Sequence, residues 1–116
     1  MRALVLIGFC QLPLAACLSG MCKNTEMSRV RAPGGVHDAV VFVRACGATT
    51  GYSSQVAIVP TGREVPDAPG NAFIHPQQVD MTVNWVAPDT LVVAGGSLVG
   101  SVGIRHVEGI TVRVSK

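Results

Sequence analysis

Residues 79–86 alternate apolar and polar side chains more regularly than any other stretch of this 116-residue chain. The apolar members have one parity (Val79, Met81, Val83 and Trp85), and the polar members have the other (Asp80, Thr82 and Asn84). Successive side chains of a β-strand point to opposite faces, so a period of two is typical of a strand with one buried face. Half-buried strands of this kind are common in antiparallel sheets. The segment therefore predicts an antiparallel β-structure, with Trp85 in the core.

Other strand patterns share the chain with this one. Residues 37–45 are apolar at both parities, which indicates a central strand buried on both faces. Pro88 is at the second position of a predicted type I turn, which would make residues 91–94 the second arm of a hairpin. Further strands are expected at 54–60, at 72–74 as a short edge and at 110–114, where Arg113 and Lys116 fit an outer strand. We expect an all-β fold, a small antiparallel sheet of five or six strands arranged as a meander, a sandwich or a partly open barrel.

The N-terminus resembles a bacterial lipoprotein export signal. Arg2 precedes an apolar segment that is too short to span a bilayer, and Leu14-Ala15-Ala16-Cys17 resembles the lipobox, in which the cysteine is acylated. Removing residues 1–16 as a signal peptide would leave Cys17 as the lipidated N-terminus, carrying acyl groups such as palmitate. Leu18 follows the cysteine, and by resemblance to the sorting rule of enteric bacteria this favours the periplasmic face of the outer membrane. A transmembrane helix is the weaker alternative, because Pro13 and the polar residues after Cys17 interrupt it.

Two cysteines remain to be assigned, because Cys10 would leave with the signal and Cys17 would carry the lipid. Cys22 and Cys46 form an even pair in an oxidising compartment, so a disulfide is the natural interpretation. Metal ligation is the alternative, but the chain has no C-x-x-C or H-x-x-x-H spacing to support it. We therefore predict a disulfide and no metal or other cofactor.

The chain divides into three parts on this interpretation. Residues 1–16 are the signal, residues 17–35 form a polar, lipid-anchored tether that ends at a Pro-Gly-Gly turn, and residues 36–116 form the β domain. The formal net charge is +2, without the clustered basic residues that nucleic-acid binding would need. The expected partners are the membrane, through the lipid on Cys17, and an envelope protein or glycan.

The run from Cys46 to Ile58 carries a resemblance to a family. It reads C-G-A-T-T-G-Y-S-S-Q-V-A-I and resembles the core motif of small bacterial proteins of unknown activity, many of which look like lipoproteins. Cys22-Lys23-Asn24 resembles the upstream cysteine segment of that family, which supports the pairing of Cys22 with Cys46. Ala45 departs from the aspartate that commonly precedes the motif cysteine. The resemblance brings no activity with it.

The same run is the best candidate for a functional surface. Thr49, Thr50, Tyr52, Ser53 and Gln55 lie close together in the sequence between and after two glycines, and they could bind a sugar, a peptide or an anion. A purely structural role is the alternative, in which Gly47 and Gly51 adopt positive φ and the hydroxyls bond the loop's own backbone.

Catalysis has little support in the sequence. Ser53, His75 and Asp80 are of the residue types that a hydrolase triad uses, but no G-x-S-x-G elbow accompanies them. We therefore expect no catalytic residues and no enzyme. The predicted function is that of a lipid-anchored envelope protein with a structural or interaction role. The alternative is a periplasmic binding or inhibitor module that uses the 47–55 loop.

Overall fold

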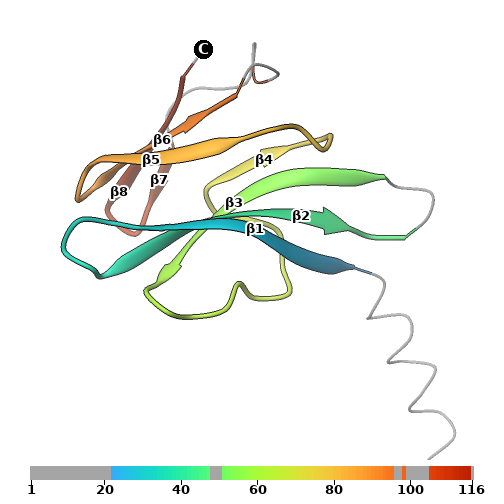
Figure 1. Cartoon of the computed structure of the whole chain (residues 1–116), viewed down its shortest axis with the longest axis horizontal. Helices are drawn as coiled ribbons and strands as arrows, with labels where there is room; N and C mark the ends of the chain where they lie inside the picture. Colours follow the sequence, from blue (N-terminus) through green and yellow to red (C-terminus); the bar gives the residue numbers. More distant parts are fainter. Residues whose placement is uncertain (1–21, 48–50, 96–97, 99–104, 116) are drawn as a thin grey trace, which may run out of the picture.

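The computed structural model describes residues 22–47, 51–95, 98 and 105–115, and it confirms the all-β prediction (Figure 1). These residues form two four-stranded sheets, which are mainly antiparallel and are not closed into a barrel. No α-helix occurs in this described part of the chain. The N-terminal 21 residues, including the predicted lipidation site Cys17, lie outside it.

The first sheet has the strand order β1-β2-β3-β4. Its strands are β1 (Lys23–Arg31), β2 (His37–Ala45), β3 (Tyr52–Pro60) and β4 (Phe73–His75), and each pairs antiparallel with its neighbour. The second sheet has the order β5-β6-β8-β7, with β5 (Thr82–Ala87), β6 (Thr90–Ala94), β7 (Arg105–Val107) and β8 (Ile110–Val114). The pairing of β6 with β8 is parallel. The described residues therefore form eight strands where the sequence predicts five or six, and the two additional strands are β1 and β7.

β1 corrects the prediction of a tether over residues 17–35. Residues Lys23–Arg31 pair with β2 along nearly their whole length, and a bulge interrupts the register between Glu26 and Ser28. Most β1 side chains are exposed, because the strand is at the edge of its sheet. An exposed edge strand carries few apolar residues, and the bulge breaks what period remains. The segment therefore looks like a solvated linker in the sequence.

The position of β8 is a second correction. Arg113 was expected on an outer strand, but β8 lies between β6 and β7 inside the second sheet. Arg113 is exposed because it points away from the core, while Ile110 and Val112 on the other face are buried. A charged residue on an alternating strand marks a solvent-exposed face and does not identify an edge. Lys116 lies outside the described residues.

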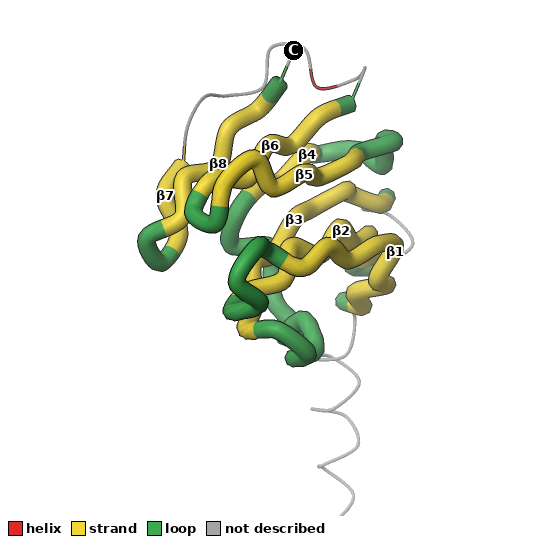
Figure 2. Tube along the Cα trace, turned by 60° about the vertical axis from the view of Figure 1, so that its left-hand side comes forward, coloured by secondary structure: helices red, strands yellow, loops and turns green. Residues whose placement is uncertain are grey.

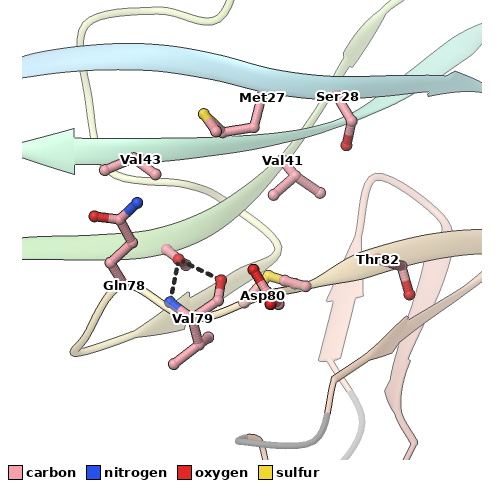
Figure 3. A pocket seen from close by; sticks show the side chains of 10 residues that line it. Met27, Ser28, Val41, Val43, Gln78, Val79, Asp80 and Thr82 are labelled. Atoms are coloured by element: carbon pink, nitrogen blue, oxygen red, sulfur yellow. Dashed lines mark hydrogen bonds between the residues drawn. The ribbon is translucent and has the colours of Figure 1, made fainter.

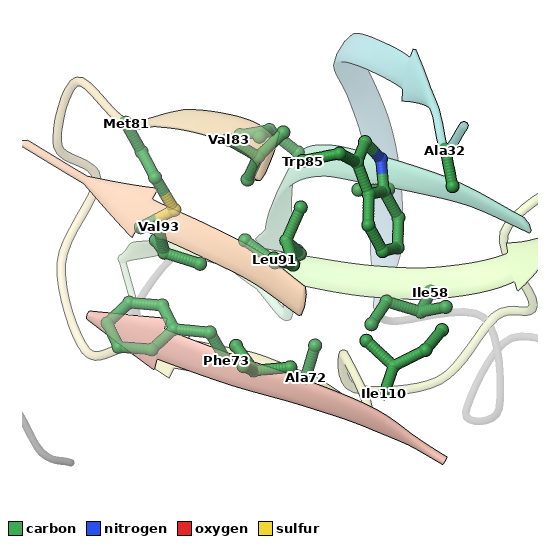
Figure 4. Packing of buried hydrophobic residues seen from close by; sticks show 14 of the residues in the cluster. Ala32, Ile58, Ala72, Phe73, Met81, Val83, Trp85, Leu91, Val93 and Ile110 are labelled. Carbon is green, nitrogen blue, oxygen red and sulfur yellow. The ribbon is translucent and has the colours of Figure 1, made fainter. Parts of the chain in front are cut away.

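The main hydrophobic core lies between the two sheets (Figure 2). It contains the inward-facing residues of both, among them Val41, Val56, Ile58, Phe73, Val83, Trp85, Leu91, Val93, Ile110 and Val112 (Figure 4). Trp85 is in the core as predicted, and its indole nitrogen Nε1 donates a hydrogen bond of 2.9 Å to the carbonyl oxygen of Val30. This bond joins the edge strand of one sheet to the edge strand of the other.

A smaller core covers the outer face of the first sheet. It contains Val40, Phe42, Ala57 and Val59, and Val65 from the loop after β3 packs against it. β2 is thus buried on both faces, as its apolar run predicts. The loop over residues 61–71 lies across this face, and Gly70 approaches β3 so closely that a Cβ atom there would lie 2.5 Å from the carbonyl oxygen of Val56.

Candidate binding groove

A disulfide joins Cys22 and Cys46 at one end of the β1–β2 hairpin, which confirms the predicted pairing. The two cysteines flank the last pair of the ladder, Lys23 with Ala45. At the opposite end, Pro33 and Gly34 form a turn closed by a 2.9 Å hydrogen bond from the Gly35 amide to the Ala32 carbonyl oxygen. Gly34 has a φ of 95°, as the third residue of a type II turn requires. The hairpin is therefore closed covalently at one end and by a tight turn at the other.

The predicted loop after Cys46 is described only at its two ends. Gly47 and Gly51 have φ values of 111° and 70°, which confirms the expected use of glycine at positive φ. Thr49 and Thr50 lie outside the described residues. Tyr52 begins β3, and its side chain is 58% exposed. Of the loop residues that the structure describes, Tyr52 is thus the one with a large side chain presented to solvent.

Ser53 and Gln55 are on the outer face of β3, where Gln55 bonds both Ser53 and the loop that follows β3. The Gln55 amide nitrogen Nε2 donates a 2.7 Å hydrogen bond to Ser53 Oγ, and Gln55 Oε1 accepts a 2.7 Å bond from the Gly70 amide. Gln55 is 5% exposed. These bonds tie the 61–71 loop to the sheet, so Gln55 has a structural role in this fold.

Ser54 lies on the inner face, where it fixes the segment that leads into β5. Its hydroxyl donates to the Val79 carbonyl oxygen at 3.0 Å and accepts from the Val79 amide at 2.9 Å. The Ser54 amide also donates to the Gln77 carbonyl oxygen at 3.1 Å. A backbone-bonded, almost fully buried hydroxyl is not poised as a nucleophile.

The structure does not bring the hypothetical hydrolase residues together. Ser53 is on the outer face of the first sheet, whereas Asp80 lines a cavity on the inner side. His75 bonds Gln77 through its ring nitrogen Nδ1. Across the described ranges, no three His, Cys, Asp or Glu side chains are grouped so that they could hold a metal ion.

A groove lies between the inner face of the first sheet and the segment that enters β5 (Figure 3). One cavity of about 700 Å³ is lined by Met27, Ser28, Val41, Val43, Ser54, Gln78, Val79, Asp80, Met81 and Thr82. A second cavity of about 310 Å³ shares Met27, Val43 and Gln78 with it and continues past Thr25 to Lys23, Ala45 and Tyr52. We call this combined feature the groove. It connects Tyr52 to a surface that sequence reasoning did not find.

Apolar and polar side chains both line the groove. Val41 and Val43 lie beneath Met27, which is at the β1 bulge and is 59% exposed. Lys23 lies at one end and Asp80 at the other. A surface of this kind suits an elongated ligand that makes both apolar contacts and hydrogen bonds. Sequence reasoning missed Met27 because it assigned this residue to the tether. Met27 lines the groove only because β1 pairs with β2.

Charged side chains concentrate on the opposite, outer face. Arg29 Nη1 donates a 2.8 Å hydrogen bond to Asp38 Oδ2, and its other nitrogens bond both carboxylate oxygens of Glu26. Asp38 is 2% exposed and also accepts bonds from the Thr61 hydroxyl and the Gly62 amide. Burial raises the pKa of Asp38, but these hydrogen bonds outweigh it and hold the pKa below its usual value. The cluster anchors the start of the 61–71 loop, so its charges are structural.

Comparisons with family models, curated proteins and solved structures find no match to this chain. The resemblance in the Cys46–Ile58 run therefore stays a prediction. Where the structure describes the chain, it contains no helix long and apolar enough to cross a membrane.

Proposed function

We propose that this chain is a lipid-anchored protein of the bacterial cell envelope, with a non-catalytic interaction role performed through the groove. Cys17 carries the anchor, and the export signal over residues 1–16 directs the chain out of the cytoplasm. The membrane is one partner, and an envelope protein or a glycan is the other. In a Gram-negative cell, the periplasmic face of the outer membrane is the favoured location.

One observation carries the interaction role: the groove contains an exposed apolar side chain at its centre. Met27 is 59% exposed above Val41 and Val43, and Tyr52 extends the same surface. Exposed methionine and tyrosine side chains supply adaptable apolar contact area, and such surfaces commonly mark binding sites. The disulfide supports an oxidising compartment, since such bonds are rare in the cytosol.

The alternative is a binding or inhibitor module that uses the 47–55 loop, and fewer residues of that loop support it in the structure. Ser53 and Gln55 bond each other, and Gln55 also bonds the 61–71 loop. Among the described loop residues, Tyr52 supports this alternative because its side chain is exposed. Tyr52 also lines the groove. We therefore place the binding surface along the groove, with the loop at one end of it.

The anchor is tested by replacing Cys17 with serine. We expect the unaltered protein in the membrane fraction of the producing bacterium, and the Cys17→Ser variant to lose membrane association because acylation requires the thiol. Mass spectrometry of the unaltered protein should find acyl groups on an N-terminal Cys17. A Cys17→Ser variant that remains membrane-bound would overturn the anchoring proposal.

The groove is tested by photo-crosslinking in intact cells. A benzophenone amino acid replaces Met27 in one variant and Val86 in a second, because Val86 is 55% exposed on the solvent-facing side of β5 and is not a lining residue of the groove. We expect a discrete crosslinked partner from position 27 that is absent from position 86. Identical products from both positions, or none from position 27, would contradict the assignment of the groove.

A further inference from the structure

We propose that the disulfide-closed end of the domain, with Lys23 and Tyr52, docks on the surface of the lipid bilayer. This inference rests on the proposed anchoring through Cys17, and it adds an orientation to it. The occupant of this end of the molecule is the interfacial region of a membrane that contains anionic lipid.

Chain length provides the first argument. Cys17 is five residues before Cys22, and an extended residue spans at most about 3.6 Å, so the lipidated cysteine lies within about 18 Å of Cys22. Cys22 is fixed to Cys46 by the disulfide and leads directly into the β1–β2 ladder. The anchor therefore holds this end of the folded domain close to the bilayer surface.

The exposed residues at this end have the chemistry of a membrane interface. The Tyr52 side chain is 58% exposed, and tyrosine favours the headgroup level because it has an apolar ring and a polar hydroxyl. Lys23 is exposed at the same cavity, across Ala45 of β2 from Tyr52. A lysine can lay its aliphatic stem along apolar surface while its charge reaches a headgroup.

The positive charge of Lys23 favours a bilayer that contains anionic lipid. Of the residues that line the smaller cavity, Lys23 is the charged one, and the others are Thr25, Met27, Val43, Ala45, Tyr52 and Gln78. A basic side chain near an anionic bilayer surface is attracted to the negative headgroups. Asp80 lines the larger cavity and not the smaller one, so that carboxylate lies further along the groove.

The proposal predicts which parts of the domain stand away from the membrane. The Pro33–Gly35 turn and Val36 are at the other end of the hairpin, separated from Cys46 by β2 (Figure 1). Nine residues of β-strand extend about 30 Å. Val36 is an apolar residue that is 65% exposed. A domain that docks by its disulfide-closed end nevertheless keeps Val36 in water, away from the bilayer.

The test uses the full lipidated protein in vesicles of phosphatidylcholine with phosphatidylglycerol, some of whose acyl chains are brominated to quench tryptophan. Tyr52→Trp is the probe and Val36→Trp is the matched control. Trp85 gives the same buried background in both, since it is 9% exposed. We expect brominated lipid to quench the Tyr52→Trp fluorescence well beyond that of the unaltered protein and to leave Val36→Trp at the background. Lys23→Gln in the Tyr52→Trp chain should reduce the quenching.

Each outcome decides one of the two proposals. If the protein floats with the vesicles and Tyr52→Trp is unquenched, the docking is wrong and the anchoring stands. Equal quenching of both probes shows a domain lying flat, which also overturns the proposed orientation. If the unaltered protein does not float with the vesicles, the anchoring fails and the docking fails with it. Unchanged quenching when phosphatidylglycerol is omitted would contradict the role given to Lys23.

Discussion

Asp38 is a carboxylate buried at the start of β2 and bonded by three groups from two parts of the chain: Arg29 in β1, and Thr61 and Gly62 in the loop after β3. An ionised carboxylate in such a position is stable only while these donors remain. Its folded-state pKa is lowered, and so is that of Glu26, mainly through the hydrogen bond from Arg29. Both groups therefore contribute stability in their ionised forms.

This arrangement predicts acid sensitivity. A lowered folded-state pKa gives stability that is complete above the unfolded value of about 4, and that is lost as the pH falls through the folded value. We expect Asp38→Asn to lower the free energy of unfolding by about 2–3 kcal/mol at pH 7, and the difference from the unaltered protein to shrink below about pH 4. Urea denaturation at several pH values measures this difference in the free energy of unfolding. Glu64→Gln, on the exposed loop, is the control. A difference that does not change with pH would exclude the charge as its cause.

At the residue scale, the sequence predicts side chains whose role depends on local pattern, but not those whose role depends on distant partners. Trp85 is in the core because its strand alternates, and Gly47 and Gly51 have positive φ, which glycine adopts without a steric cost. Gln55 was predicted as a binding residue, yet its acceptor oxygen bonds the amide of Gly70, fifteen residues later. Which partner comes within reach is decided by the path of the loop, and no local pattern encodes it.

At the element scale, the strands with a buried face were predictable and the exposed ones were not. β2 and β8 have the predicted bounds, and β5 and β6 form the predicted hairpin. β1 was missed because an edge strand with a bulge has no apolar period, and β7 was missed because only one of its three residues, Val107, is apolar. The groove depends on β1, so it could not be predicted once that strand was taken for a tether.

The pairing of β1 with β2 predicts a measurable effect of the disulfide. A cross-link that closes a loop of about 25 residues stabilises the folded state by about 3.5 kcal/mol on the chain-entropy model. We expect Cys22→Ser with Cys46→Ser to lower the free energy of unfolding by about this amount. Amide hydrogen exchange should then accelerate most in β1, with β5 and β6 as internal controls. Fast exchange along β1 with the disulfide intact would contradict the strand and support a tether.

At the scale of the whole molecule, stability depends on the core between the two sheets. Leu91 is fully buried at the centre of that core. Leu91→Ala should therefore cost about 2–5 kcal/mol and lower the midpoint of urea unfolding followed by Trp85 fluorescence. Val92→Ala is the matched control, because Val92 faces the other side of β6 and is only partly buried. Equal losses for the two variants would show that the sheets do not pack as described.

The disulfide also decides how the domain responds to mechanical force. A pull on the chain at Cys22 passes through the sulfur bridge to Cys46, since the two cysteines are covalently joined across a separation of 24 residues. The β1–β2 hairpin is thereby excluded from the loaded path, and its hydrogen bonds cannot be unzipped by tension from the N-terminal side. A contour length of about 80 Å is withheld from extension. Under tension between an N-terminal anchor and a bound partner, the domain would yield elsewhere, and the strand that carries Met27 would keep its shape.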